Sequence, residues 1–122
     1  MGQGFWKNHP AAWPVGTLRL GSQTYTAGEL LGVLRTRTAH DASLKLADQL
    51  IVAKLSIASG SDPTTIGTTV ADADRLLAGF GGKLPYGVSP SSVLGRSIVS
   101  DGHLLRRYNR GRQTPTCVRS FH

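Results

Sequence analysis

Few of the side chains that could do chemistry are spaced for a shared site in this chain of 122 residues. The histidines are His9, His40, His103 and His122, and only His40 has a potential metal ligand, Asp41, directly beside it. The sequence holds no H-E-x-x-H pattern or similar metal motif. We therefore predict no metal site and no cofactor. The alternative is a metal-binding domain in which folding brings His9 and His40 to a carboxylate.

The nucleophilic side chains lack the partners that catalysis requires. Ser100 and His103 are three residues apart on an expected helix, but a serine nucleophile also needs an orienting group and a donor site for the oxyanion. Cys117 lies close to arginines, which favour a thiolate. Because it is the only cysteine, it cannot form an intramolecular disulfide, and an intermolecular one is the alternative to a free thiol. We predict no catalytic residues and a protein that is not an enzyme.

The positive charge is concentrated near the C-terminus. The formal net charge is +7, and residues 96–122 hold six arginines against a single aspartate. We expect four arginines to bind an anionic ligand: Arg106, Arg107, Arg110 and Arg112. Tyr108 is a stacking group among them if that ligand is a nucleic acid. The alternative is that these cations are solvated and stabilise the C-terminal end of a helix dipole.

One ion pair is expected between helices. Asp72 lies near an apolar helical stripe and is predicted to meet Lys54 of the preceding helix. An isopeptide crosslink between these two side chains is the alternative. Asp74, two residues further on, points to a different face of the same helix.

Local signals predict the elements that must position these side chains. Gly21-Ser22 separates two short alternating segments, which is typical of a β-hairpin. Thr26 and Glu29 form a capping box that begins a helix over residues 27–36. Asp41 caps a second helix, apolar over much of its circumference, which is predicted to be central and to end at Gly60.

Two further helices follow the same logic. Asp62-Pro63 predicts a helix that begins at Pro63 and ends at the glycines of residues 79–82. Ser89-Pro90 predicts the start of a last helix, which Gly111 ends. The expected fold is mostly α, a small antiparallel bundle of three to four helices with a short β-hairpin near the N-terminus. We expect one domain over residues 1–111 and a basic arm over residues 112–122.

The sequence has no apolar run that approaches the ~20 residues of a membrane span. The first residues also lack the apolar stretch of a signal peptide. The chain is therefore expected to be cytosolic, or to have lost a signal peptide.

The opening Gly4-Phe5-Trp6-Lys7-Asn8-His9-Pro10 resembles the signature of a family of helical modules from predicted secreted and cell-surface bacterial proteins. Further segments are similar to that family over nearly the whole chain: 20–26, 46–55, 71–74 and 108–111. Family members often carry a histidine at the position of Asp48. They often carry two cysteines, of which only Cys117 is present here, because Met1-Gly2 stands at the place of the first.

The resemblance implies a place outside the cell or on its surface, but no activity. We expect a non-enzymatic structural or interaction module, with other subunits, further copies of the chain or an anionic surface polymer as partners. The alternative is a basic module for a polysaccharide or nucleic acid. In the opening segment, Trp6 and Trp13 are expected to form a structural clamp with Lys7, Asn8 and His9 beside them. A ligand site formed by these five residues is the alternative.

Overall fold

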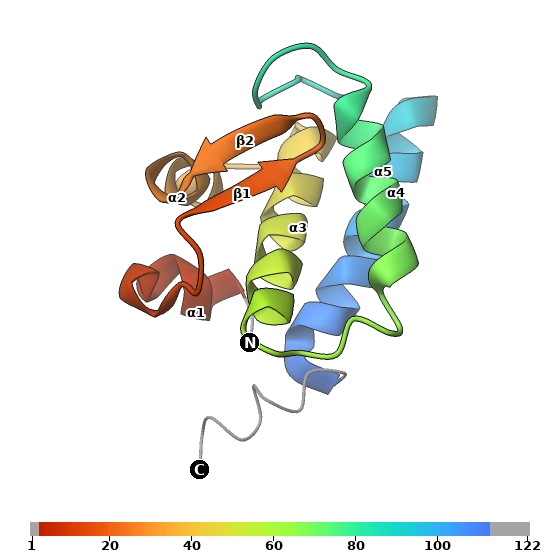
Figure 1. Cartoon of the computed structure of the whole chain (residues 1–122). Helices are drawn as coiled ribbons and strands as arrows, with labels where there is room; N and C mark the ends of the chain where they lie inside the picture. Colours follow the sequence, from red (N-terminus) through yellow and green to blue (C-terminus); the bar gives the residue numbers. More distant parts are fainter. Residues whose placement is uncertain (1–2, 113–122) are drawn as a thin grey trace.

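The structure, a computed structural model, describes residues 3–112. The fold is mostly α, with a helical bundle and a two-stranded antiparallel hairpin near the N-terminus, as predicted (Figure 1). In chain order the elements are α1 (Gln3–Asn8), the 3-10 turn η1 (Pro10–Ala12), β1 (Thr17–Leu20), β2 (Gln23–Thr26), α2 (Ala27–Arg35), α3 (Ala42–Ala58), α4 (Gly67–Ala78), α5 (Val93–Arg107) and the π-helical turn η2 (Tyr108–Arg112).

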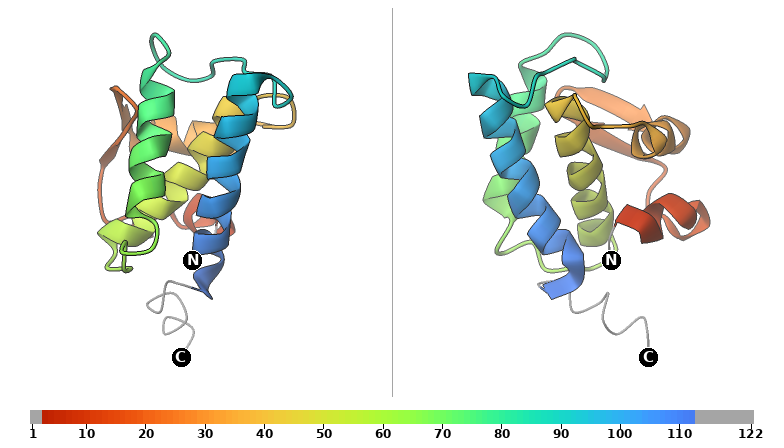
Figure 2. Two further views of the ribbon diagram at one scale, coloured as in Figure 1. Left: turned by 90° about the vertical axis from the view of Figure 1, so that its right-hand side faces the viewer. Right: turned by 180° about the vertical axis from the view of Figure 1, so that it is seen from behind.

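Helix α3 is the centre of the fold, as its nearly continuous apolar surface predicts. Twelve of its 17 residues are buried. It packs against α5 and α4 on one side and against α1, α2 and the hairpin on the other. Consecutive helices of the α3–α4–α5 bundle run in opposite directions (Figure 2). Both faces of α3 are therefore covered. Side chains of α3 can take part in a surface site only where the neighbouring elements leave part of the helix exposed.

The hairpin lies on the bundle with its tip against the end of α4. Its register pairs Leu20 with Gln23 around the Gly21-Ser22 turn, and Leu20 and Tyr25 are buried. Gly21 has a φ of 63°, which favours glycine. A Cβ at Gly21 would also lie 2.8 Å from the backbone nitrogen of Ala78. The turn requires glycine for both reasons.

Helix α2 begins with the predicted capping box. The backbone N–H of Glu29 donates to Thr26 Oγ1 over 3.2 Å, and the N–H of Thr26 donates to Glu29 Oε1 over 3.0 Å. The helix ends at Arg35, where Thr36 takes an extended conformation. Arg35 is therefore the last residue of α2, and Arg37 lies in the link that leads to α3.

The predicted start of α4 at Pro63 is wrong. Asp62 does accept a hydrogen bond from the N–H of Thr64, over 2.9 Å, but the capped segment is a turn. The helix begins four residues later, at Gly67. An Asx cap followed by proline suits an isolated turn as well as a helix, so the motif alone did not distinguish the two.

Helix α5 also begins later than Ser89-Pro90 predicts. It begins at Val93, and the side chain of Ser92 caps it by accepting from the N–H of Gly95 over 2.9 Å. A Cβ at Gly95 would lie 1.9 Å from the carbonyl oxygen of Ser89. The segment before the helix therefore folds back against its first turn. Over residues 3–112, no helix combines the length and apolar character needed to cross a membrane.

Candidate anion-binding site

A concentration of positive charge surrounds a concavity over the first half of α3. We call it the cationic pocket. It has a volume of about 580 Å³. Six basic side chains line it: Lys7, Arg35, Arg37, Lys45, His103 and Arg106. They come from α1, the end of α2 with its following link, α3 and α5. Figure 2 (right) shows these elements together, with α3 between α5 on one side and α1 and α2 on the other.

Helical spacing gathers the α3 and α5 side chains of the pocket. On α5, Val99, His103 and Arg106 lie on one face because they are separated by three, four and seven positions. On α3, Lys45 and Asp48 are one turn apart and face the same way. Helix α5 approaches α3 at Gly102, where a Cβ would lie 4.0 Å from the Cα of Leu46. The close approach places the two sets of side chains around one opening.

The pocket has a strongly positive balance. Five of its side chains are lysine or arginine, and its lining contains one carboxylate, that of Asp48. Arg35, Arg37, Lys45 and Arg106 are exposed, whereas Asp48 is only 4% exposed. The charges that a ligand meets first are therefore positive. A concave cluster of cations focuses the field and attracts anions.

Of the four arginines predicted to act together, Arg106 and Arg107 line different hollows. Arg106 lines the cationic pocket, but Arg107 lines a different hollow of α5. Arg110 is exposed in η2, and the side chain of Arg112 lies outside the described residues. Tyr108 is fully buried and donates to the carbonyl oxygen of Asp62 over 2.7 Å, so the prediction of a stacking group is wrong.

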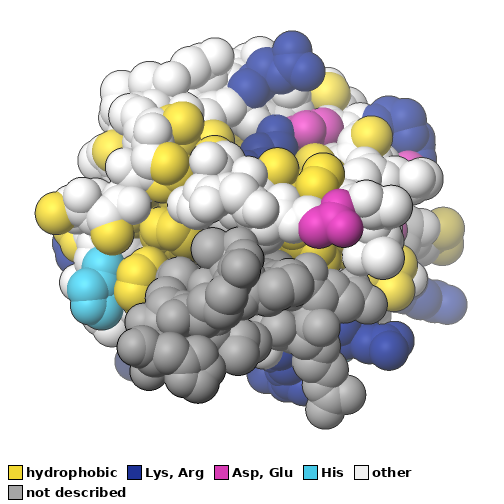
Figure 3. Space-filling model, turned by 60° about the horizontal axis from the view of Figure 1, so that its bottom comes forward, with side chains coloured by type: hydrophobic (Ala, Val, Ile, Leu, Met, Phe, Trp, Pro, Cys, Tyr) yellow, Lys and Arg dark blue, Asp and Glu magenta, His cyan; other side chains and the backbone are white. Residues whose placement is uncertain are grey.

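At the end of the bundle where η2 lies, the described residues do not form a continuous basic surface. In the part of this face that the described residues form, Lys and Arg side chains stand mostly toward the margins, and hydrophobic or uncharged side chains fill much of the rest (Figure 3). The cations of the pocket share almost no local sequence pattern, because Lys7, Arg35, Lys45 and Arg106 are far apart in the chain. The one local signal is the Arg-x-Arg pattern of Arg35 and Arg37, which begins at the last residue of α2.

The aromatic opening packs against the other end of α3. Trp6 is buried and donates from Nε1 to Ser56 Oγ over 3.3 Å. Trp13 donates from Nε1 to the carbonyl oxygen of Trp6 over 2.8 Å. His9 stacks on Phe5, and its Nδ1 is 2.8 Å from the Phe5 carbonyl oxygen.

The residues of this segment therefore have different surroundings. Trp6 and Trp13 contact each other, whereas Asn8 is exposed. Lys7 lines the cationic pocket instead of joining the two tryptophans in a common ligand site.

The residues that a metal or hydrolytic site would need are apart. His9 contacts Phe5, Asp48 lines the cationic pocket and Asp72 lies between α4 and α5. Between Gln3 and Arg112, no three His, Cys, Asp or Glu side chains are close enough to hold a metal ion. Cys117 and His122 lie outside the described residues.

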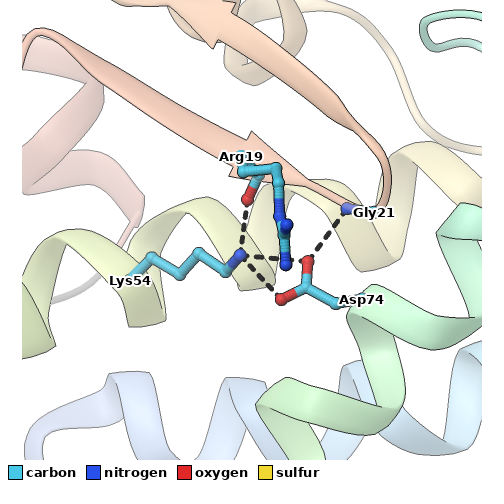
Figure 4. Close-up of polar contacts among 4 residues, drawn as sticks. All are labelled: Arg19, Gly21, Lys54 and Asp74. Atoms are coloured by element: carbon cyan, nitrogen blue, oxygen red, sulfur yellow. Dashed lines mark hydrogen bonds and ion pairs between the residues drawn. The ribbon is translucent and has the colours of Figure 1, made fainter.

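Asp72 does not meet Lys54, contrary to the prediction. Lys54 Nζ lies 2.8 Å from Asp74 Oδ2, at ion-pair distance, and 3.0 Å from Asp74 Oδ1 (Figure 4). The N–H of Gly21 donates to the same carboxylate over 2.9 Å, and Lys54 donates to the carbonyl oxygen of Arg19. The pair thus joins α3, α4 and the hairpin.

Asp72 of α4 instead faces Asp101 of α5, beside a hollow of about 610 Å³. The two helices lie side by side in Figure 2 (left). Burial, together with the hydrogen bond and charge of Asp72, raises the pKa of Asp101 to about 7. The hydrogen bond from Asp101, together with Arg75, lowers the pKa of Asp72. The two carboxyl groups therefore share a proton near neutral pH.

Comparison with known proteins adds no relative: the chain matches no protein-family model, no curated protein and no solved structure.

Proposed function

We propose that this protein is a non-enzymatic binding module that holds an anionic ligand in the cationic pocket. The observation that carries the proposal is the convergence of Lys7, Arg35, Arg37, Lys45 and Arg106 on one concavity of about 580 Å³. That volume is within the range of about 300–1,000 Å³ that is typical of ligand pockets. Arginine and lysine are the side chains that bind carboxylate, phosphate and sulfate groups.

The arrangement of the cations supports a specific anion-binding site over non-specific attraction of anions by the net charge. They come from α1, α2, the link after it, α3 and α5, so they converge only in the folded chain. By contrast, Arg19 is exposed on β1 and does not line the pocket. The proposal therefore predicts that single cations differ in their effect on binding, although each substitution changes the net charge equally.

A titration with pyrophosphate, followed by the NMR shifts of backbone amides, tests the proposal. We expect saturable shifts in residues 35–38 and 102–106. Arg35→Gln should weaken binding about tenfold, since a charge-assisted hydrogen bond is lost. The matched control, Arg19→Gln, should leave the affinity close to that of the unmodified protein. Shifts that never saturate, or equal losses in both variants, would overturn the proposal.

A structural or interaction module on the cell surface is the second candidate. It is supported by apolar side chains left exposed along α5, where Val93 is 83% and Leu104 44% exposed. Such side chains, next to arginines, are common where proteins meet. We expect the parent reading frame to encode a signal peptide, and a frame without any export signal would contradict this localisation.

A further inference from the structure

We propose that the ligand of the cationic pocket is an acidic polypeptide segment that carries an apolar side chain. In this arrangement the segment crosses α5, with acidic groups in the cationic pocket and its apolar side chain in the hollow next to it. The inference rests on the proposed function and names the class of partner. The hollow that Arg107 lines has no role in binding an anion in the cationic pocket alone.

This second hollow, the apolar groove, has a volume of about 390 Å³. Pro90, Val99 and Leu104 give it an apolar floor, and Arg96 and Arg107 stand at its ends. The two arginines are eleven positions apart on α5, which places them on the same face of the helix and about 16 Å apart along its axis. The groove is therefore an apolar surface with a cation at either end.

The cationic pocket and the apolar groove are neighbours. Val99 and His103 line both of them, from the same face of α5. A ligand that leaves the pocket over these two side chains enters the groove directly. One extended occupant could thus meet the pocket cations, an apolar floor and then Arg96 or Arg107.

The cationic pocket and the apolar groove together favour one class of ligand, because that ligand must carry both acidic groups and an apolar side chain. Sulfated polysaccharides carry regular charge without apolar side chains, so they would leave Leu104 uncovered. Nucleic acids place bases on aromatic platforms, but among the described residues no Phe, Tyr or Trp lines either hollow. A polypeptide combines carboxylates and an apolar side chain within a few residues. It complements both surfaces.

Two fluorescent peptides of equal charge test this inference: Glu-Glu-Leu-Glu-Glu and Glu-Glu-Ser-Glu-Glu. Fluorescence anisotropy would measure their affinities for the whole chain. We expect the leucine peptide to bind about fivefold more tightly, because its side chain is buried in the groove. Leu104→Ser should remove that preference. Val93→Ser is the matched control, since Val93 is exposed on α5 but lines neither hollow, and it should retain the preference.

The outcomes separate this inference from the proposed function. Equal affinities for the two peptides, with weaker binding of both to Arg35→Gln, would overturn the apolar contact and leave the anion site intact. Binding of pyrophosphate without binding of either peptide would also overturn the inference alone. Failure of pyrophosphate and both peptides would overturn the proposed function as well. A leucine preference that Leu104→Ser abolishes and Val93→Ser keeps would support the inference.

Discussion

Lys54 and Asp74 hold three elements together through one partly buried ion pair. Lys54 Nζ is 2.8 Å from Asp74 Oδ2, and the two side chains are 17% and 20% exposed. The carboxylate also accepts from Gly21, and the ammonium donates to the carbonyl oxygen of Arg19. The hairpin tip is thereby tied to both α3 and α4.

We expect Lys54→Met to lower the free energy of unfolding by about 2 kcal/mol, because it leaves Asp74 partly buried without its cation. Chemical denaturation followed by circular dichroism would measure the loss. Lys83→Met is the matched control: Lys83 pairs with Glu29 at 2.7 Å, but both side chains are about 40% exposed. It should change stability little, since exposed pairs are screened by solvent. Equal losses would contradict the special role of the Lys54–Asp74 pair.

The shared proton of Asp72 and Asp101 predicts a dependence of stability on pH. The pKa of Asp101 is raised from 3.8 to about 7, so the folded chain binds this proton more tightly than the unfolded chain. The resulting stability is present below about pH 4 and is lost as the pH rises to about 7. Asp101→Asn should remove this loss and be more stable than the unmodified protein at pH 8 by about 1 kcal/mol, as screening limits the effect. Denaturation between pH 4 and pH 8 measures it, and parallel pH profiles of the two proteins would contradict it.

The parts of the fold that the sequence predicted well depend on local chemistry. The Thr26–Glu29 box, the Gly21-Ser22 turn and the Asp41 cap each act within four residues of chain, so neighbouring residues suffice to specify them. The predicted start of α4 at Pro63 was wrong, because the Asx cap at Asp62 also suits an isolated turn.

Helical periodicity alone could not predict whether Asp72 or Asp74 pairs with Lys54. Periodicity identifies a face of α4 but leaves open which carboxylate meets Lys54. Asp74 is selected by tertiary contacts at the hairpin: the N–H of Gly21 donates to its carboxylate, and the carbonyl oxygen of Arg19 accepts from Lys54 beside it. Gly21 and Arg19 lie more than 50 residues from Asp74 along the chain.

The cationic pocket could not be predicted for the same reason. Arg106 was expected to act with its neighbours in the sequence, but the packing of α5 on α3 brings it to Lys45 instead. Arg107 is turned by about 100° from Arg106 around the same helix, so it lines the other hollow.

Asp41 should stabilise the fold through more than a helix cap. Its carboxylate accepts from the N–H and the hydroxyl of Ser43, and from the N–H groups of Gly87 and Val88. Burial alone raises the pKa of Asp41, but these hydrogen bonds outweigh it and hold the pKa below its usual value. The stability is therefore present above the pKa of the unfolded chain and lost as the pH falls through the folded value.

We accordingly expect Asp41→Ala to lose about 2 kcal/mol at pH 7, since it removes the cap and the bonds to the 87–88 segment. The difference from the unmodified protein should narrow below pH 4, where the carboxylate becomes protonated. Denaturation at both pH values checks this. A difference that does not change with pH would show that the charge of Asp41 is unimportant.

Gly102 offers a stabilising change next to the pocket. It lies inside α5, and a Cβ there would be 4.0 Å from the Cα of Leu46, an ordinary contact distance. Gly102→Ala should therefore raise the free energy of unfolding by about 0.5–1 kcal/mol, because alanine has the higher helix propensity. Thermal denaturation would measure it, and a lower melting temperature would show that α5 cannot accept the methyl group.

The two tryptophans of the opening segment should differ in their effect on stability but not on binding. Trp6 is 2% exposed and bonded to Ser56, so Trp6→Ala should cost about 3–5 kcal/mol through the cavity it leaves. Trp13 is only half-buried, so Trp13→Ala should lower the free energy of unfolding by less. Because neither side chain lines the cationic pocket, Trp13→Ala should bind pyrophosphate as the unmodified protein does. Combined denaturation and NMR titration test both points. A loss of pyrophosphate binding in Trp13→Ala, with its stability retained, would instead indicate a ligand site in the aromatic opening.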